Sequence, residues 1–357
     1  MNIYGISCYR FVLPLCTSTH LGKGLTTTRE GMLLAVEGAG GRTGWGEVSP
    51  LPGFSRETLT SVIDAARRIA ISLRQCTTTA ALRSCTPDVT GSPSLFFGFQ
   101  TALNALTAPV NEAMRVPLCA LLDGATETVY NEALRSRRLG YSVAKLKVGR
   151  GAVDEDIAVV REVRRRLSGA CRLRFDANRA WSFDDAARFC DAAAGNDVDY
   201  IEEPLIDPTQ LGRLYERTGM PCAVDESLQS LSACLFSGKD RESPREEHLL
   251  RDIIAGAQAL VWKPSLCMPP SRMALETDAP VVLSGAYESG VGTAAVLAHT
   301  AAQGPDAPAA GVDTYSRLAE DVLVHRLPLE GAAANLRTVK EKLQDLNMAA
   351  LTQVWHV

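Results

Sequence analysis

Six charged side chains that could share one active site follow apolar runs in the second half of the chain. In order they are Lys145 and Lys147 in YSVAKLKVG, Asp176 in LRFDAN, Glu202 in VDYIEEP, Asp225 in CAVDES and Lys263 in ALVWKPS. From Lys147 onward, successive positions are 29, 26, 23 and 38 residues apart, and each interval fits one strand followed by one helix. Because a parallel (β/α) barrel places its strand carboxyl ends on one rim, these side chains are predicted to meet there.

The carboxylates among them predict a site for a hard divalent cation. Asp176, Glu202 and Asp225 supply only oxygen ligands, a set typical of Mg²⁺ with open positions for substrate, and Mn²⁺ is an alternative ion. A lone aspartate at a strand end is more often a helix cap, but three on consecutive strands favour a metal site. Glu203 and Glu226 directly follow two of the candidates, and choosing Glu202 over Glu203 rests on strand alternation and stays open.

The lysines are candidate general bases. Lys145 and Lys147 share one strand face, and Lys263 comes from a strand across the barrel. We expect burial and a nearby dication to lower their pKa. A single lysine on a strand could instead form a structural salt bridge with a neighbouring carboxylate. Lysines on opposite sides of the barrel make that alternative weaker. A lysine beside the α-carbon of a metal-bound carboxylate could abstract the α-proton, and the cation would stabilise the enolate.

The elements that position these residues differ between the two ends of the chain. MLLAVEG and TGWGEVSP predict an antiparallel hairpin followed by helices, whereas apolar and amphipathic runs alternate later, as in a parallel sheet. The predicted fold class is α/β. We expect an α+β capping domain over residues 1–110, a barrel of seven or eight strands over 111–320, and a C-terminal segment, 321–357, that packs back on the capping domain.

Composition narrows the class of partner. Acidic and basic residues number 41 and 37, which gives a net charge of −4. A chain with this charge has no overall positive potential that would attract nucleic acid or anionic lipid. No apolar stretch reaches the roughly 18 residues of a membrane span, which predicts a cytoplasmic protein. The ten cysteines contain no CxxC pair and the five histidines show no ligand spacing, which argues against disulfides and zinc. We expect a small-molecule carboxylate substrate, and the oligomeric state does not follow from the sequence.

Taken together, the motifs resemble the enolase superfamily, in particular its muconate-lactonizing subgroup. The resemblance covers nearly the whole chain and implies a capping domain with a modified (β/α)7β TIM-like barrel. It is carried by Lys-x-Lys on the second strand, DAN on the third, EEP on the fourth, DES on the fifth and the lysine of WKP on the sixth. GWGEVSPLPGFSRET, LRFDANRAW and LSGAYESGVG are most similar to the o-succinylbenzoate synthases of menaquinone biosynthesis.

That resemblance implies an activity and a role for each lysine. The reaction would be Mg²⁺-dependent syn-dehydration of 2-succinyl-6-hydroxy-2,4-cyclohexadiene-1-carboxylate to 2-succinylbenzoate, through a metal-stabilised enediolate. Lys147 would abstract the α-proton and return it to the departing hydroxyl. Lys263 would face the opposite side of the ring, and Lys145 would contact the substrate carboxylate.

It also implies supporting residues around the chemistry. Asn178 and Arg174 would orient Asp176, although Asn178 could equally be a loop cap. Ser284 and Gly285 would bind the succinyl tail, with the Gly285 N–H close to the ligand, and a plain turn is the alternative.

Three further segments are interpreted from their composition. GKGLTTTREG, residues 22–31, suits a lid over the substrate, with an idle surface loop as the alternative. The segment 50–54, PLPGF, offers an apolar wall. Residues 231–250 depart from the family pattern and resemble an insertion.

Other functions fit parts of the pattern. An N-acylamino acid racemase, or another enzyme of the subgroup, would use Lys147 and Lys263 as two bases on one α-carbon. A dipeptide epimerase is disfavoured because Asp313 in GVDTY lacks the second acid of a DxD pair. A Schiff-base aldolase does not explain the three carboxylates, and a metal-dependent binding protein does not explain the complete catalytic set.

Overall fold

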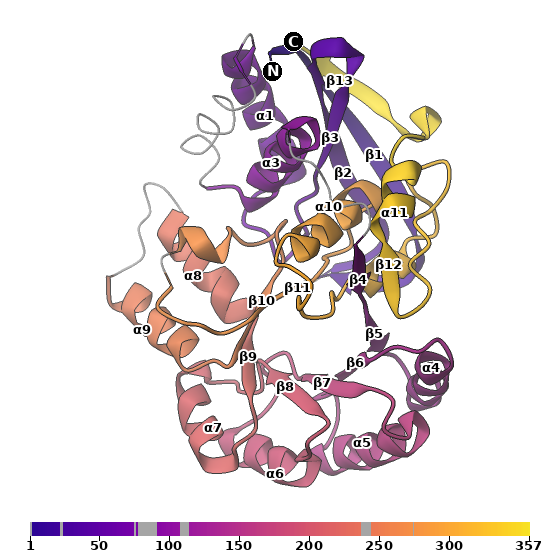
Figure 1. Ribbon diagram of the computed structural model, residues 1–357. Coiled ribbons are helices and arrows are strands. Elements are labelled where there is room, and N and C mark those ends of the chain that lie inside the picture. The colour runs from indigo at the N-terminus through magenta and orange to yellow at the C-terminus, as the bar shows by residue number, and fades with distance from the viewer. Residues whose placement is uncertain are drawn as a thin grey trace.

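The computed structural model describes residues 2–21, 24–74, 76–77, 91–107, 114–236, 244–273 and 275–357. It has an antiparallel sheet with two helices at one end and a curved parallel sheet with outer helices at the other (Figure 1). The predicted fold class, an α/β barrel with a capping domain, is confirmed. Within these ranges no helix combines the length and apolarity needed to cross a bilayer.

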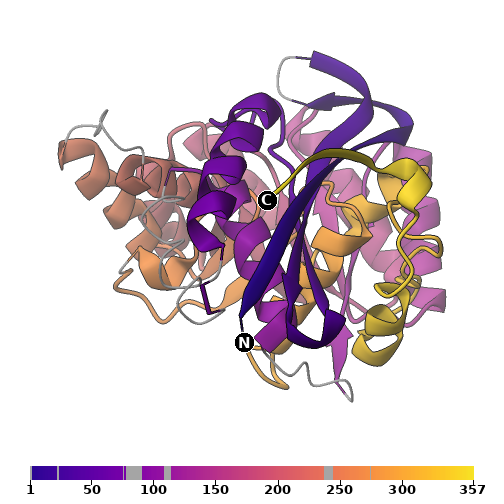
Figure 2. The ribbon, with the colours of Figure 1, turned by 90° about the horizontal axis from the view of Figure 1, so that it is seen from above.

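The capping domain is built on a four-stranded antiparallel sheet in the order β13-β1-β2-β3. Its elements are β1 (Ile3–Leu21), β2 (Gly24–Gly38), β3 (Thr43–Val48), β13 (Thr352–His356), α1 (Leu59–Leu73) and α3 (Pro93–Thr107). Apolar side chains of β1 and β2 pack against both helices in one core, because alternate strand residues face the same side. Seen from above, this sheet lies across the barrel (Figure 2).

The barrel sheet has seven parallel strands in the order β11-β10-β9-β8-β7-β6-β5. The strands are β5 (Cys119–Leu122), β6 (Val143–Lys147), β7 (Arg172–Asp176), β8 (Val198–Glu202), β9 (Cys222–Val224), β10 (Ala259–Trp262) and β11 (Val281–Leu283). Parallel bridges from Leu118 to Ala310 and from Ser284 to Gly311 join the two edges through a short eighth segment. The strands therefore close into a ring.

The helices of the barrel mostly alternate with its strands. They are α4 (Thr126–Arg138), α5 (Val153–Leu167), α6 (Phe183–Ala193), α7 (Leu211–Thr218), α8 (Glu226–Phe236), α9 (Pro244–Ala255) and α10 (Gly290–Ala301). The exceptions are that α8 and α9 both lie between β9 and β10, and that the described residues between β10 and β11 include only a short 3-10 helix. The helix α5 shows why the sequence is helical here: its acidic residues lie in the first turn and its basic residues in the last, which suits the helix dipole. Its apolar side chains face the barrel core.

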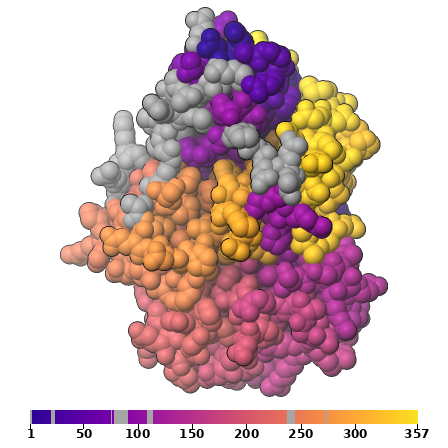
Figure 3. All heavy atoms as spheres, viewed as in Figure 1, coloured from indigo at the N-terminus to yellow at the C-terminus, as the bar shows by residue number. Residues whose placement is uncertain are grey.

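The C-terminal segment contacts both parts of the molecule. The strand β12 (Ala333–Asn335) pairs with β4 (Arg115–Pro117) beside the barrel, α11 (Leu336–Lys342) follows it, and β13 then joins the capping sheet. In the space-filling view this yellow segment runs along one side of the molecule (Figure 3).

One sequence interpretation changes here, and the interpretation of residues 231–250 as an insertion stays a prediction. Residues 24–31, predicted to be part of a lid loop, belong to β2, because they pair with β1 in a long hairpin, while residues 22 and 23 lie outside the described ranges. The stretch 231–250 contributes to α8 and α9, and residues 237–243 are likewise outside the described ranges.

Candidate active site

The strand register brings the predicted lysines and acids to one rim. Lys147 is opposite Asp176 in the β6–β7 pairing, and Asp176 is opposite Glu202 in the β7–β8 pairing. Lys147 Nζ lies 2.6 Å from Asp176 Oδ2, and Lys145 Nζ lies 2.7 Å from the same oxygen and 2.8 Å from Glu202 Oε2. Across the barrel, Lys263 Nζ contacts Asp225 Oδ2. All three carboxylates are buried.

Charges within this network shift the pKa of the two central acids in opposite directions. Burial and the charge of Asp176 raise the pKa of Glu202 to about 8. Burial also acts to raise the pKa of Asp176, but Lys145 and Lys147 outweigh it and hold that pKa well below the usual range. Burial and the neighbouring carboxylate thus disfavour the charged form of Glu202, whereas the two lysines favour the charged form of Asp176.

The buried carboxylates act against the predicted lowering of the lysine pKa. Burial acts to lower the pKa of Lys145, but Asp176 and Glu202 outweigh it and hold the pKa well above its usual value. The pKa of Lys263 is raised in the same way by Asp225. These contacts are the salt bridges named above as the alternative, and a lysine pKa lowered by a bound dication stays a prediction.

Asn178 holds the lysine that is the candidate base. Its side-chain oxygen accepts a hydrogen bond from Lys147 Nζ at 2.7 Å, and its backbone N–H donates to Asp176 Oδ1 at 3.2 Å. Its side-chain amide donates to Glu226 Oε1 at 3.1 Å. Asn178 adopts a positive φ of 45°, which asparagine tolerates better than most residues. It therefore orients both Lys147 and Asp176.

Glu202, the last residue of β8, and Glu203, which follows it, point to different partners. Glu202 contacts Lys145, whereas Glu203 accepts hydrogen bonds from the backbone N–H groups of Asp225 and Ser227, at 3.0 and 2.6 Å. Arg179 Nε donates to Glu203 at 2.9 Å. Glu202 thus faces the lysines, and Glu203 holds the backbone that carries Asp225.

Sequence reasoning missed a second support for Asp225. Gln229 Nε2 donates to Asp225 Oδ1 at 2.7 Å from one turn further along α8. The i, i+4 spacing of an acid and an amide was the available signal.

Arg174 lies deeper in the barrel than expected. It donates to Asp199 Oδ2 at 3.1 Å and to the carbonyl of Ala309 at 2.8 Å, and its guanidinium stacks over Tyr200. Within the described residues the side-chain hydrogen bonds of Arg174 go to these two oxygens and not to Asp176, so Arg174 supports the barrel interior and does not hold Asp176 directly.

Ser284 and Gly285 line the cavity, but their hydrogen bonds point to the barrel. The Gly285 N–H donates to the Gly311 carbonyl at 2.9 Å, and Ser284 Oγ donates to the same oxygen at 3.1 Å. The expectation that the Gly285 N–H approaches the ligand is therefore wrong, since that donor is occupied. A Cβ at Gly285 would meet Glu288 and Thr314 at 3.1 and 3.3 Å, so the glycine keeps the cavity wall closely packed.

A cavity of about 660 Å³ lies above the rim and is lined by Lys145, Lys147 and Lys263. Leu51 and Phe54 close it from the capping domain, as predicted for the proline-rich segment. Thr17, Ser18 and Thr19 of β1 also line the cavity. The sequence predicts a lid over the substrate at residues 22–31, a few residues further along the chain.

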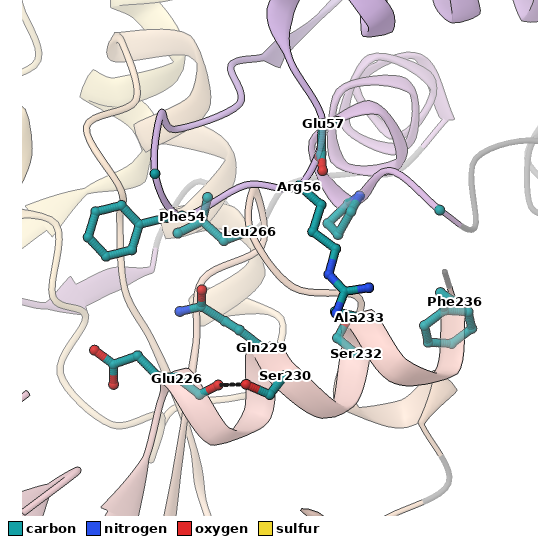
Figure 4. A pocket seen from close by; sticks show the side chains of 13 residues that line it. Phe54, Arg56, Glu57, Glu226, Gln229, Ser230, Ser232, Ala233, Phe236 and Leu266 are labelled. Atoms are coloured by element: carbon teal, nitrogen blue, oxygen red, sulfur yellow. Dashed lines mark hydrogen bonds between the residues drawn. The ribbon is translucent and has the colours of Figure 1, made fainter. Parts of the chain in front are cut away.

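A second cavity, of about 360 Å³, adjoins the first beneath the same capping segment. Phe54, Leu266 and Glu226 line both cavities. Figure 4 shows Phe54 beside Leu266, Glu226 below them on α8, and Arg56 extending toward Ser232. The apolar pair therefore separates the two spaces.

The three carboxylates have the chemistry of a site for a hard divalent cation. Asp176, Glu202 and Asp225 are buried oxygen donors on adjacent strand ends, and the negative charges of Asp176 and Asp225 both raise the pKa of Glu202. Over the described ranges no three acid, His or Cys side chains are preassembled at metal spacing. In residue type, burial and charge the set fits Mg²⁺, with lysine ammonium groups now lying against the carboxylates.

Known protein families match most of this architecture. Residues 4–106 match the family model described as MenC, N-terminal domain, and residues 128–235 match Enolase C-terminal domain-like. Together the two matches span more than half of the chain. The chain belongs to the enolase superfamily. Its motif resemblance to the o-succinylbenzoate synthases, which are hydro-lyases, is also confirmed, and so is the prediction that it is an enzyme.

Individual relatives support this placement within the enolase superfamily. An o-succinylbenzoate synthase from Edwardsiella ictaluri is 28% identical over 88% of this chain and 91% of that enzyme. Protein PHYLLO, chloroplastic, from Arabidopsis thaliana is 29% identical over 87% of this chain, which spans only 22% of PHYLLO. A dipeptide epimerase from Cytophaga hutchinsonii, complexed with Mg and a dipeptide, shares the fold, with a TM-score of 0.75 and 19% identity over 99% of both chains.

Proposed function

We propose that the chain is an o-succinylbenzoate synthase, which removes water from 2-succinyl-6-hydroxy-2,4-cyclohexadiene-1-carboxylate to form 2-succinylbenzoate. The observation that carries the proposal is the pair of lysines on separate strands around one cavity. Lys147 ends β6, Lys263 follows β10, and three strands lie between these two in the sheet. A substrate ring in this cavity would have an ammonium group on either side.

Lys147 is the residue placed to move the proton. In its neutral form its Nζ would take the α-proton of the substrate, and it would then return that proton to the departing hydroxyl on the same face, which leaves as water. Asn178 and Asp176, at 2.7 and 2.6 Å, hold the ammonium form in place between the two steps.

The remaining groups manage the negative charge that develops on the substrate carboxylate. Asp176, Glu202 and Asp225 would hold Mg²⁺, which when bound supplies positive charge opposite that developing charge. Lys263 adds a cation from the other wall, and Asp225 keeps it in place. Leu51 and Phe54 exclude water above the ring, which strengthens these interactions. Roles in menaquinone biosynthesis and in the cytoplasm stay predictions.

A second candidate is an N-acylamino acid racemase. It is favoured by the same two lysines, because bases on opposite walls can exchange an α-proton between two faces, and by the fold shared with a dipeptide epimerase.

One experiment distinguishes the two candidates. The purified protein with Mg²⁺ is given the cyclohexadiene substrate, and 2-succinylbenzoate is measured by chromatography. In parallel, N-succinyl amino acids are incubated in deuterated buffer and α-exchange is followed by NMR. We expect rapid dehydration. Rapid α-exchange with negligible dehydration would assign the racemase instead.

A further inference from the structure

Two arginines, Arg150 and Arg317, line the catalytic cavity and share one carboxylate. We propose that Arg150 and Arg317, held by Asp123, bind a second carboxylate of the substrate, so that the enzyme selects dicarboxylates. The inference deepens the proposed function and rests on it.

The three residues come from adjacent segments of the rim. Asp123 directly follows β5, Arg150 lies three residues beyond Lys147 of β6, and Arg317 ends the short helix η4 (Asp313–Arg317) after the eighth segment. This part of the ring lies away from β8 and β9, which carry Glu202 and the backbone leading to Asp225.

One carboxylate is shared between the two guanidinium groups. Arg150 Nη2 lies 2.6 Å from Asp123 Oδ1, and Arg317 Nη2 lies 3.5 Å from Asp123 Oδ2. Two guanidiniums carry ten N–H donors, whereas a carboxylate has about four acceptor positions, so Asp123 cannot satisfy both. The side chains of Arg150 and Arg317 are 59% and 36% exposed, and both line the catalytic cavity.

The neighbouring acid does not cancel this positive charge fully. Asp313 also lines the cavity, and burial raises its pKa although Arg317 opposes that shift. The surplus of guanidinium donors therefore favours an anion from outside the chain, and paired planar guanidiniums suit a carboxylate geometrically.

The positive charges of the two arginines and of Lys263 all affect Tyr287, which lines the same cavity. Burial raises the pKa of Tyr287, while the positive charges of Arg317, Lys263 and Arg150 act on the same hydroxyl. The arginines and the catalytic lysine thus surround one space. The proposed substrate has a ring carboxylate and a second carboxylate on a flexible succinyl chain. With the ring carboxylate near the β7 to β9 acids, the chain would extend toward Arg150 and Arg317.

The test measures binding of 2-succinylbenzoate and of its terminal amide, which lacks only the second charge, to the Mg²⁺-loaded protein by calorimetry. Arg317→Gln should weaken binding of 2-succinylbenzoate by about 10- to 100-fold, the range for a hydrogen bond to a charged group. Arg150→Gln should weaken it by about 3- to 10-fold, because Arg150 is more exposed. Binding of the amide should change less than twofold, and in turnover KM should rise while kcat stays within about twofold.

Arg188→Gln is the matched control. Arg188 on α6 is 53% exposed and paired with Asp154, similar to Arg150 in both respects, but it does not line the catalytic cavity. It should leave binding of both ligands unchanged. Three results would refute the arginine site. The arginine variants could lose affinity equally for 2-succinylbenzoate and for its amide, or they could bind both as tightly as the original protein does. The original protein could also show no preference for 2-succinylbenzoate over the amide. A wild-type protein that prefers the diacid without catalysing dehydration would instead refute the proposed function alone.

Discussion

The catalytic cluster of buried charges and a second cluster, between the capping domain and the barrel, are built differently. In the catalytic cluster, ammonium groups contact carboxylates directly, as Lys145 does with Asp176 and Glu202. In the cluster between the capping domain and the barrel, Glu47 of β3 accepts hydrogen bonds from the N–H groups of Ser289 and Gly292 at the start of α10, at 3.1 and 2.9 Å. There the partners are mostly backbone groups.

Arg29 completes the interdomain cluster. It donates to the carbonyls of Tyr287 and Pro50, at 3.1 and 2.7 Å, and to that of Ser49. It is almost completely buried, and burial lowers its pKa despite the nearby charge of Glu47. Arg29 thereby joins the proline-rich segment of the capping domain to the loop after β11, and both segments line the catalytic cavity.

The opposite pKa directions of Arg29 and Lys145 show what separates the clusters. At the interface, burial outweighs the opposite charges; at the active site, the opposite charges outweigh burial. Backbone partners fix one geometry, whereas an ion pair can exchange its cation for another. The interface is therefore suited to hold the two parts together, and the catalytic cluster is suited to bind, release and transfer charged species.

The largest expected effect comes from breaking the catalytic cluster at Lys147. Lys147→Ala should reduce dehydration by about 10³-fold or more, because general acid–base groups contribute on the order of 10²–10⁴-fold and this lysine performs both transfers. The melting temperature should change little, since Lys145 still neutralises Asp176. Initial rates and thermal melts of the variant check this, with Lys342→Ala on α11 as the surface control. Full activity in Lys147→Ala would remove the mechanism.

Metal removal tests whether the catalytic carboxylates exchange cations. EDTA should abolish activity, added Mg²⁺ should restore it, and the circular dichroism spectrum should be unchanged, because lysines contact all three carboxylates. Rates before and after dialysis measure this. Undiminished activity in EDTA would contradict the proposed metal site.

Breaking the interface should instead cost stability. Glu47→Gln should lower the free energy of unfolding by about 2–4 kcal/mol, because it weakens several buried hydrogen bonds and removes one of the negative charges near the buried guanidinium of Arg29. Thermal melts measure the loss, and the rate per folded molecule should stay within a few-fold of the original. A Glu47→Gln protein with normal stability would refute the contrast drawn between the clusters.

A smaller, pH-dependent effect is expected at the same interface from His299. Its ring lies 6.0 Å from that of Phe97 in the capping domain and 5.7 Å from that of Trp262 in the barrel, and burial lowers its pKa to about 4. The unfolded chain, with a histidine pKa of about 6.5, binds more protons between these values, so stability should fall as pH drops from about 6.5 toward 4. We expect a loss of about 2–3 kcal/mol across that window.

Thermal melts at several pH values check the histidine prediction. His299→Leu should remove that part of the pH dependence while keeping the ring contacts partly filled. A variant with the same pH profile as the original protein would show that other groups are responsible.

Much of the catalytic rim could be predicted from local patterns. Strand alternation placed Lys145 with Lys147 and separated Glu202 from Glu203, and the βα spacing put the acids on one edge. Glu47 and Ser289 are 242 residues apart, and no local periodicity relates them. The threonines of residues 24–31 suggested a loop by composition, but pairing with β1 decided their structure.

The pairing of β1 with β13 also bears on the order of folding. Ser7 lies opposite His356, so the barrel is enclosed in a loop of 349 residues, whereas neighbouring barrel strands pair over far shorter separations. Closing a long loop costs conformational entropy before its contacts contribute, and such contacts form slowly. We expect the barrel to assemble first and the capping sheet to gain its outer strand, β13, last. A folding intermediate would then have the catalytic rim formed while the capping sheet still lacks β13.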